Sequence, residues 1–281
     1  MTFEEIRKYQ LAQLELMKMV DELCSKLNLT YYIIGGTLLG AVRHGGFIPW
    51  DPDIDIAMPR KDYEAIRKYF SENESDRYFY QHYSTEKNHL SPHALIKIKD
   101  SHVVVKSIYT PYRPRYDGIY LDVFPLDNAP VSQKLQERQT NRIQRLKKII
   151  FFKARYTYPS NSWIKVLAKK CISALLTPWS FYFLNKKMDK TMQKYNGQSS
   201  EYLVSMASHY SYWKQLMPQA VYGKPERINF EGLSLLAPAQ THEYLTRIYK
   251  NYMELPPEEQ RNAILDVFER IEYSSNDCEK K

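Results

Sequence analysis

The sequence has few cysteines and no long apolar run. Its three cysteines, Cys24, Cys171 and Cys278, are far apart, odd in number and without metal-ligand spacing, which argues against a disulfide framework or a zinc site. No uninterrupted apolar run reaches the roughly 18 residues of a membrane span. The N-terminus, MTFEEIRKYQ, has acids where a signal peptide has a basic stretch and then an apolar one. We therefore expect a cytoplasmic protein, free or peripheral on the inner face of the cell membrane.

The chain also lacks internal repeats and low-complexity linkers. Its 281 residues, 43% of them apolar and 14% aromatic, can build a substantial core, so the protein is expected to be globular. Near residue 130 the pattern changes from mixed helix and strand to mostly helix. We predict one unit over residues 1–130 and, packed on it, a mostly helical basic region with a C-terminal cap over residues 131–281.

Acidic residues are absent from one long stretch. Between Arg138 and Lys187 there are twelve Lys or Arg and no Asp or Glu, and subtracting 12 from the net charge of +8 leaves −4 for the rest. Apolar and aromatic residues interrupt this basic segment, a composition typical of surfaces that contact anionic lipid. A structural helix is the alternative. No nucleic-acid motif accompanies the charge, so we expect no nucleic-acid partner.

Hydrophobic periodicity and turn residues divide the chain into alternating helices and strands. This order predicts an α+β fold, with a mixed sheet flanked by helices and a mostly helical C-terminal half. The expected helices are 3–28, 37–44, 60–70, 131–153, 163–176 and 181–195, with two more beginning at Gln240 and Pro257; the expected strands are 31–34, 53–58, 94–99, 102–108 and 118–124, with a β pair near 228–236.

Asp53 and Asp55 alternate with Ile54 and Ile56 in one predicted strand. Side chains two apart on a strand share a face, so the two carboxylates would lie about 7 Å apart at their Cα atoms. Like charges held so close repel unless a cation lies between them, and carboxylate oxygens suit Mg²⁺ or Mn²⁺. The alternative is a pair of acids on a solvated strand face. Their sequence context favours a metal site.

A glycine turn precedes this strand. Gly35 and Gly36 interrupt the chain, and a short predicted helix begins at Thr37. Backbone N–H groups at a glycine-rich turn and a helix N-terminus favour an anion. We predict that Gly35, Gly36 and Thr37 hold phosphate beside the metal.

A third acid, Asp122, lies within the apolar strand 118–124. A buried carboxylate is rarely unpaired, so Asp122 requires a partner. It either completes the metal site or forms a salt bridge or backbone hydrogen bond. Asp127, a few residues on, is expected to cap a turn.

Three further side chains are candidates for substrate binding. Arg43 ends the short helix and has the donor geometry to bind a diphosphate, or it offsets the helix dipole. Lys97 either neutralises developing phosphate charge or lies on a solvated strand face. Trp50 either stacks on a base or a quaternary ammonium group, or belongs to the core.

Residues 35–55 carry GGTLLGAVRH, GFIPWD and DID, residues 121–127 read LDVFPLD, and residues 249–261 read YKNYMELPPEEQR. These three stretches resemble the LicD family of phosphocholine transferases, to which fukutin-related proteins are also similar. Two departures stand out. Pro52 replaces the middle acid of the family's W-D-D-D-I-D, which makes Asp51 a less certain ligand, and Tyr249-Lys250-Asn251 stands where Y-G-D is common.

The resemblance implies a nucleotidyltransferase-like catalytic core over 1–130, with Asp53, Asp55 and Asp122 at the positions of its catalytic, metal-binding acids. It also implies Mg²⁺-dependent transfer of phosphocholine from CDP-choline or a related CDP-alcohol to a hydroxyl of a cell-surface glycan, such as teichoic acid or lipopolysaccharide, or its lipid-linked precursor, with release of CMP. Two alternatives remain: a nucleotidyltransferase that releases pyrophosphate, and an inactive binding or scaffold member of the fold.

Overall fold

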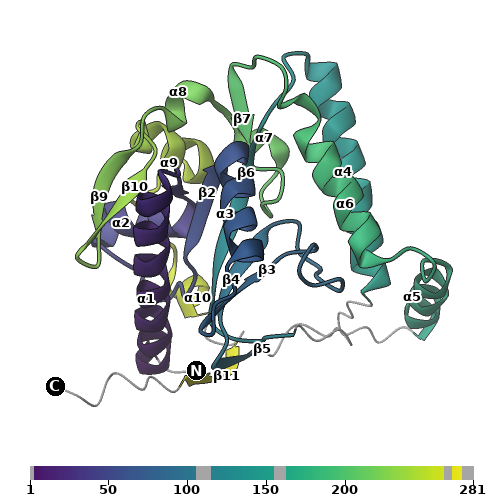
Figure 1. Ribbon diagram of the computed structural model, residues 1–281, viewed down its shortest axis with the longest axis horizontal. Coiled ribbons are helices and arrows are strands. Elements are labelled where there is room, and N and C mark those ends of the chain that lie inside the picture. The colour runs from purple at the N-terminus through teal and green to yellow at the C-terminus, as the bar shows by residue number, and fades with distance from the viewer. Residues whose placement is uncertain (1–2, 106–114, 155–162, 263–267, 274–281) are drawn as a thin grey trace.

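A mixed sheet forms the centre of the protein. The computed structural model describes residues 3–105, 115–154, 163–262 and 268–273, and in it the sheet lies between one long N-terminal helix and a pair of later helices (Figure 1). Its strands follow the order β1 (Tyr32–Ile33), β2 (Asp55–Pro59), β6 (Tyr120–Asn128), β4 (Ala94–Ile98) and β3 (Tyr78–Gln81). Strands β2 and β6 run parallel, and the other neighbours in this order are antiparallel. The predicted α+β class is confirmed.

Strand β6 continues past the main sheet. Its last residues pair with β7 (Tyr202–Val204), which pairs in turn with β8 (Leu216–Pro218). A hairpin of β9 (Glu226–Phe230) and β10 (Leu233–Ala237) lies near β1, and β5 (Ser101–Val105) pairs with β11 (Phe268–Tyr273). The chain after residue 130 therefore adds strands to the sheet of the first part, and the boundary near 130 stays a prediction.

The helices cover the sheet with the faces that their apolar periodicity predicts. Helix α1 (Phe3–Leu27) buries Tyr9, Leu16 and Val20 completely. Both α1 and α3 (Arg60–Glu72) contact β6, while α4 (Gln133–Lys153) and α6 (Phe181–Met192) pack against each other. The remaining helices are α2 (Gly35–His44), α5 (Trp163–Leu175), the 3₁₀ turn Gln193–Tyr195, α7 (Tyr212–Gln215), α8 (Gln219–Tyr222), α9 (Thr241–Tyr249) and α10 (Glu258–Asn262).

Most predicted elements are present, but several boundaries differ. The glycine pair expected to precede a helix forms its first turn, since α2 begins at Gly35. The strand expected to start at Asp53 starts at Asp55. Strands β3, β7 and β8 were not predicted, because three or four residues are too few to show a period of two. Residues 106–108 of the predicted strand 102–108 lie outside the described residues, as does Cys278.

Asp127 is not a turn cap, and that expectation was wrong. It lies inside β6, is fully buried, and its two carboxylate oxygens accept hydrogen bonds of 2.8 and 2.7 Å from Nε and Nη2 of Arg60. Arg60 also binds Asp189 of α6 at 2.8 Å. Burial by itself lowers the pKa of Arg60, but the two carboxylates outweigh it and raise that pKa. This buried ion network joins α3, β6 and α6.

Candidate active site

Four carboxylates gather where β2 and β6 run side by side. Asp55, the first residue of β2, is in register with Asp122 of β6. Asp53 and Asp51 precede it at intervals of two, and all three are half-buried while the intervening Pro52, Ile54 and Ile56 are buried. The alternation predicted from the sequence is thus confirmed, and it extends back to Asp51, which sequence reasoning had placed at the margin.

Burial and mutual repulsion disfavour the charged forms of three of these acids, Asp51, Asp53 and Asp55. The pKa of Asp55 is raised well above its usual value by burial first and then by Asp122, Asp53 and Asp51. Burial, Asp51 and Asp122 raise the pKa of Asp53 in the same way. Burial also raises the pKa of Asp51 to about 6, against a smaller lowering by the backbone N–H of Asp53. The cluster therefore needs cations or protons to offset its charge.

The glycine turn lies directly against this cluster. Gly35 has a left-handed backbone (φ +56°), and a Cβ atom there would be 3.0 Å from Oδ2 of Asp55. A side chain at Gly36 would collide with the Asp51 carboxylate. Only glycine fits both positions, because no other residue leaves this space to the carboxylates. The structure brings together the first turn of α2 and the acids, as the prediction of adjoining phosphate and metal sites requires.

Thr37 holds the acidic segment in place. Its hydroxyl accepts a hydrogen bond of 2.9 Å from the N–H of Asp55 and donates one of 3.4 Å to the carbonyl of Asp53. The residue is only 2% exposed. Both hydrogen bonds of the hydroxyl are made within the protein. The prediction that Thr37 binds phosphate therefore applies to its backbone N–H.

His93 is the partner that Asp122 required, and sequence reasoning missed it. Its Nε2 lies 2.7 Å from Oδ1 of Asp122, and its ring packs 4.4 Å from that of Phe124. Its carbonyl accepts a 2.7 Å hydrogen bond from Nε2 of His89, whose own carbonyl accepts one of 2.7 Å from Asn185 of α6. His93 stands immediately before β4, and only the pairing of β4 with β6 brings it to Asp122.

Lys97 lies on the same sheet face as the acids. It is in register with Tyr120, two residues before Asp122. Its ammonium donates a 2.8 Å hydrogen bond to the carbonyl of Tyr116 and is largely buried. Burial lowers the pKa of Lys97 to about 8, although Glu86, Asp117 and Asp122 act in the opposite direction. Its predicted contact with phosphate remains a prediction.

Arg43 and Trp50 contact the C-terminal part of the chain. The Arg43 guanidinium donates to the carbonyls of Tyr252 (2.9 Å) and Glu254 (3.2 Å). The half-buried Trp50 has the guanidinium of Arg261 5.4 Å from its ring centre. Both predicted substrate-binding side chains therefore have partners within the protein. The cation that lies over the Trp50 ring is Arg261 of the same chain.

Three tyrosines border the acids, and no motif had singled them out as a group. The phenol of Tyr244 accepts a 3.4 Å hydrogen bond from the N–H of Gly35. Tyr210 and Tyr249 join through their hydroxyls at 3.1 Å, and Tyr249 approaches Gly35. The pKa of Tyr210 is raised by burial first and then by Asp55 and Asp51. The only sequence signal was Tyr249, which opens the third matching stretch.

The carboxylate oxygens of these acids are suitable ligands for a hard cation, although the side chains are not arranged in a complete metal-binding geometry. Within the described residues, no three His, Cys, Asp or Glu side chains are arranged to hold a metal ion. Oδ1 of Asp53 is nevertheless buried with no hydrogen-bond partner in that part of the chain. A buried carboxylate oxygen without a donor beside other carboxylates is suited to Mg²⁺. Asp53, Asp55 and Asp122 would hold the ion.

Comparison with known proteins identifies relatives over most of the chain. The model of the LicD/FKTN/FKRP nucleotidyltransferase domain matches residues 28–161. The lipopolysaccharide cholinephosphotransferase LicD of Haemophilus influenzae is 30% identical over 264 residues, which are 90% of this chain and 93% of that protein. The ribitol 5-phosphate transferase FKRP of Homo sapiens is 53% identical over 32 residues, 11% of this chain and 6% of that protein. An uncharacterised protein of Rickettsia prowazekii is 46% identical over 65 residues, 21% of this chain and 24% of its own length.

Proposed function

The chain belongs to the LicD family and is a phosphotransferase, and from this premise we propose that it transfers phosphocholine from CDP-choline to a hydroxyl of a cell-surface glycan or its lipid-linked precursor. The observation that carries the proposal is the register of Asp55 with Asp122, which gathers the carboxylates beside the glycine turn. The cholinephosphotransferase relative supports choline as the alcohol.

The acidic cluster would bind the donor's diphosphate through Mg²⁺, which Asp53 and Asp55 would hold. When bound, the ion offsets diphosphate charge and stabilises the leaving CMP. The backbone N–H groups of Gly36 and Thr37, in the first turn of α2, would orient phosphate oxygens. Thr37 would keep the Asp53–Asp55 backbone in position through its two hydrogen bonds.

The acceptor hydroxyl would attack the phosphorus that carries choline. A new bond forms between the acceptor oxygen and that phosphorus, and the bond to the bridging oxygen breaks, so that CMP leaves. Asp122, whose Oδ1 lies 2.7 Å from Nε2 of His93, would either complete the metal site or accept the hydroxyl proton through its other oxygen. In either role, His93 would orient this carboxylate.

The test is turnover by the purified full chain with CDP-choline, Mg²⁺ and a lipopolysaccharide acceptor, read as CMP released and choline incorporated. Asp55→Asn should lower turnover by about 1000-fold, because a metal ion contributes several kcal/mol to such a transition state. Asp76→Asn removes an exposed acid away from the cluster and serves as the matched control.

Three results would overturn the proposal. Release of pyrophosphate instead of CMP indicates a nucleotidyltransferase. Turnover of Asp55→Asn equal to that of Asp76→Asn removes the cluster from the reaction. Absence of any CDP-alcohol binding by calorimetry with Mg²⁺ present indicates a binding or scaffold protein.

A further inference from the structure

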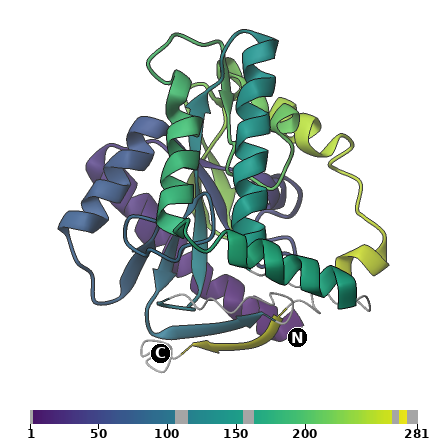
Figure 2. The ribbon, with the colours of Figure 1, turned by 90° about the vertical axis from the view of Figure 1, so that its right-hand side faces the viewer.

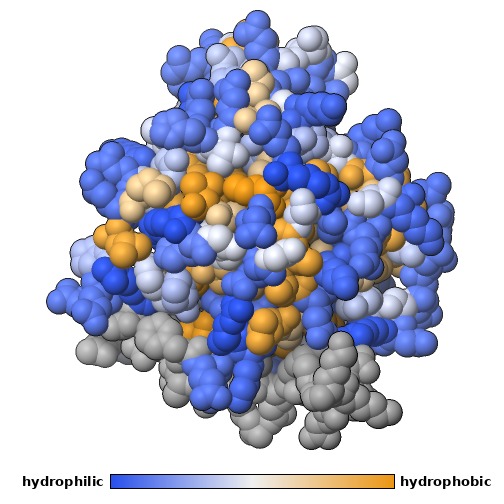
Figure 3. Space-filling model, turned by 90° about the vertical axis from the view of Figure 1, so that its left-hand side faces the viewer, coloured by the Kyte–Doolittle hydropathy of each residue, from blue (hydrophilic) through white to orange (hydrophobic). Residues whose placement is uncertain are grey.

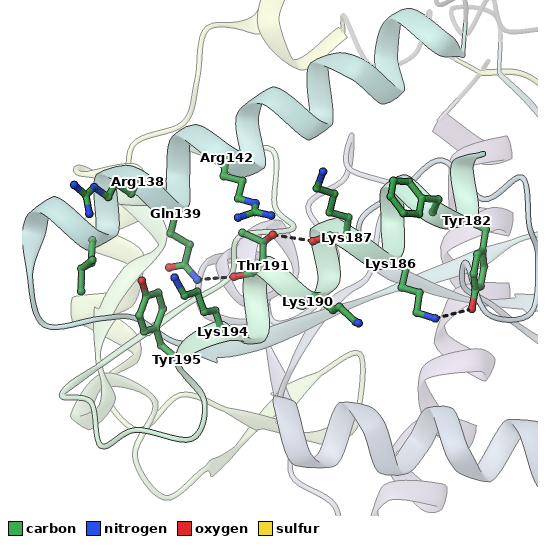
Figure 4. A pocket seen from close by; sticks show the side chains of 12 residues that line it. Arg138, Gln139, Arg142, Tyr182, Lys186, Lys187, Lys190, Thr191, Lys194 and Tyr195 are labelled. Atoms are coloured by element: carbon green, nitrogen blue, oxygen red, sulfur yellow. Dashed lines mark hydrogen bonds between the residues drawn. The ribbon is translucent and has the colours of Figure 1, made fainter. Parts of the chain in front are cut away.

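A basic groove runs between α4 and α6, two helices that lie side by side (Figure 2), and Figure 4 shows the side chains that line it. It has a volume of about 760 Å³, and six cationic side chains line it. Arg138 and Arg142 come from α4, and the lysines come from α6 and the 3₁₀ turn after it: Lys186, Lys187, Lys190 and Lys194.

In the part of the chain that the structure describes, no acidic side chain lines this groove. Among the described residues, none of its six cations forms an ion pair. The Gln139 amide at the floor of the groove already has a partner within the protein, because its Nε2 donates a 2.9 Å hydrogen bond to the carbonyl of Thr191 (Figure 4). The cations above this floor are therefore available to an external anion.

Exposed apolar side chains adjoin the groove. On α5, Trp163 is 73% exposed and Leu175 is 78% exposed. Beside the groove, Trp179 and Phe183 are 40% and 50% exposed, and the ammonium of Lys187 lies 5.4 Å from the Trp179 ring centre. Helix α5 lies below the lower end of α4 and extends to the side away from α6 (Figure 2). The opposite face also shows hydrophobic residues, which gather across its middle between hydrophilic ones (Figure 3).

A surface that combines cations with exposed tryptophan and leucine is complementary to the surface of an anionic bilayer. Lysine and arginine bind lipid phosphates while tryptophan and leucine enter the boundary between head groups and acyl chains. A nucleic acid would leave the exposed aliphatic side chains of α5 in water. Among the helices that the structure describes, none has the length and apolar character needed to cross a bilayer, so contact would be with its surface.

We propose that the α4–α6 groove, together with α5, is a docking surface for anionic membrane lipid. Phosphate head groups occupy the groove beside Arg142, Lys187 and Lys190, and the exposed side chains of α5 lie at the membrane interface. Docking requires no donor and no turnover, so it is tested independently of the transfer reaction.

The test is sedimentation of the full chain with vesicles of phosphatidylglycerol and phosphatidylcholine in equal parts, or of phosphatidylcholine alone. The mixed vesicles should bind the protein more tightly, and high salt should weaken this binding because it shortens the Debye length. Reversing Arg142, Lys187 and Lys190 to Glu should weaken it at least about 100-fold, since each cation near an anionic surface contributes about 1 kcal/mol.

The matched control reverses three exposed lysines elsewhere, Lys18, Lys26 and Lys224, and changes the net charge by the same amount. It should retain most vesicle binding. A second variant, Trp163→Ala with Leu167→Ala, keeps every charge and alters only exposed side chains, so it should fold normally and bind about tenfold more weakly.

The proposal fails if the wild-type chain does not sediment with mixed vesicles at low salt. It also fails if both charge-reversal variants lose binding equally, because net charge would then explain the attraction. Binding of a single-stranded oligonucleotide without vesicle binding would assign the groove to nucleic acid instead.

Discussion

The Thr37 side chain holds the backbone of the acidic cluster in position. It is buried, and its hydroxyl connects the backbone at Asp53 with that at Asp55. Because both hydrogen bonds are to the main chain, they fix the backbone positions from which the Asp53 and Asp55 side chains extend. A hydroxyl at this position therefore positions the acidic segment.

Thr37→Val should lower stability by about 1–3 kcal/mol, because the N–H of Asp55 loses its acceptor in a buried place. Turnover should fall at least about tenfold, a change of about 1.4 kcal/mol in barrier. Thr37→Ser removes only a methyl group and should keep turnover near wild type while losing about 1 kcal/mol of stability. Urea unfolding and initial rates measure both effects. Equal losses of turnover in the two variants would contradict the positioning role.

Asp53 illustrates a conflict between function and stability. Its buried Oδ1 lacks a hydrogen-bond donor among the described residues, and its neighbours repel its charge. Asp53→Asn should therefore raise the unfolding free energy by about 0.5–2 kcal/mol in metal-free buffer, as relief of active-site strain often does. Mg²⁺ should raise the melting temperature of the wild type but not of this variant. The same Mg²⁺ response in both would place the metal elsewhere.

At the scale of elements, the β9–β10 hairpin fastens the loop that follows α2 to α1. Glu231, at the hairpin turn, binds Arg7 of α1 at 2.8 Å and accepts the N–H of Phe47 at 3.2 Å. The Arg7 hydrogen bond, against some opposition from burial, lowers the pKa of Glu231. Distant segments are thus joined by one partly exposed carboxylate.

The sign of the pH effect follows from that lowered pKa. A carboxyl group whose pKa is lower in the folded than in the unfolded state contributes stability above its unfolded pKa and loses it as pH falls through the folded value. Glu231→Gln should therefore be less stable than wild type at neutral pH, and the difference should vanish toward about pH 3. Its size should be at most about 1 kcal/mol because the pair is partly exposed. Urea titrations across this range measure it, and a constant difference would contradict the prediction.

For the whole molecule, helix α4 lies between the acidic cluster and the basic groove. On one side Lys147 donates a 2.8 Å hydrogen bond to the carbonyl of Ser208. Ser208 precedes His209, whose pKa is lowered by burial and then by Lys147 and His93. On the other side Arg138 and Arg142 line the groove. A membrane-bound acceptor would therefore meet the protein one helix away from the proposed site of transfer.

Donor binding should stabilise the whole chain. CDP-choline with Mg²⁺, at about 100 times its dissociation constant, should add about 2.7 kcal/mol to the unfolding free energy. CDP-ribitol and CDP-glycerol provide the comparison, since they present the same diphosphate with another alcohol. Thermal shift measurements rank the donors. A larger shift with CDP-ribitol would assign ribitol phosphate as the transferred group and leave the cluster's role unchanged.

The sequence by itself determined most element types and the two acids, Asp53 and Asp55, on one strand face. Asp53, Asp55 and the isoleucines beside them show a period of two, and α1 shows a helical period. Both periods can be read from the local sequence because burial of one face of an element requires apolar residues at regular spacing. The same reasoning required a partner for Asp122 without identifying it. Sequence patterns also located the basic segment.

Only the tertiary structure decided which distant residues meet. His93 reaches Asp122 through the register of β4 with β6, Tyr210 and Tyr244 arrive from separate segments, and Asp127 pairs with Arg60 across two elements. Periodicity specifies which way a side chain faces, whereas its partner depends on strand order and register, which long-range packing determines. The acids were therefore predictable from sequence, and the residues that hold them were not.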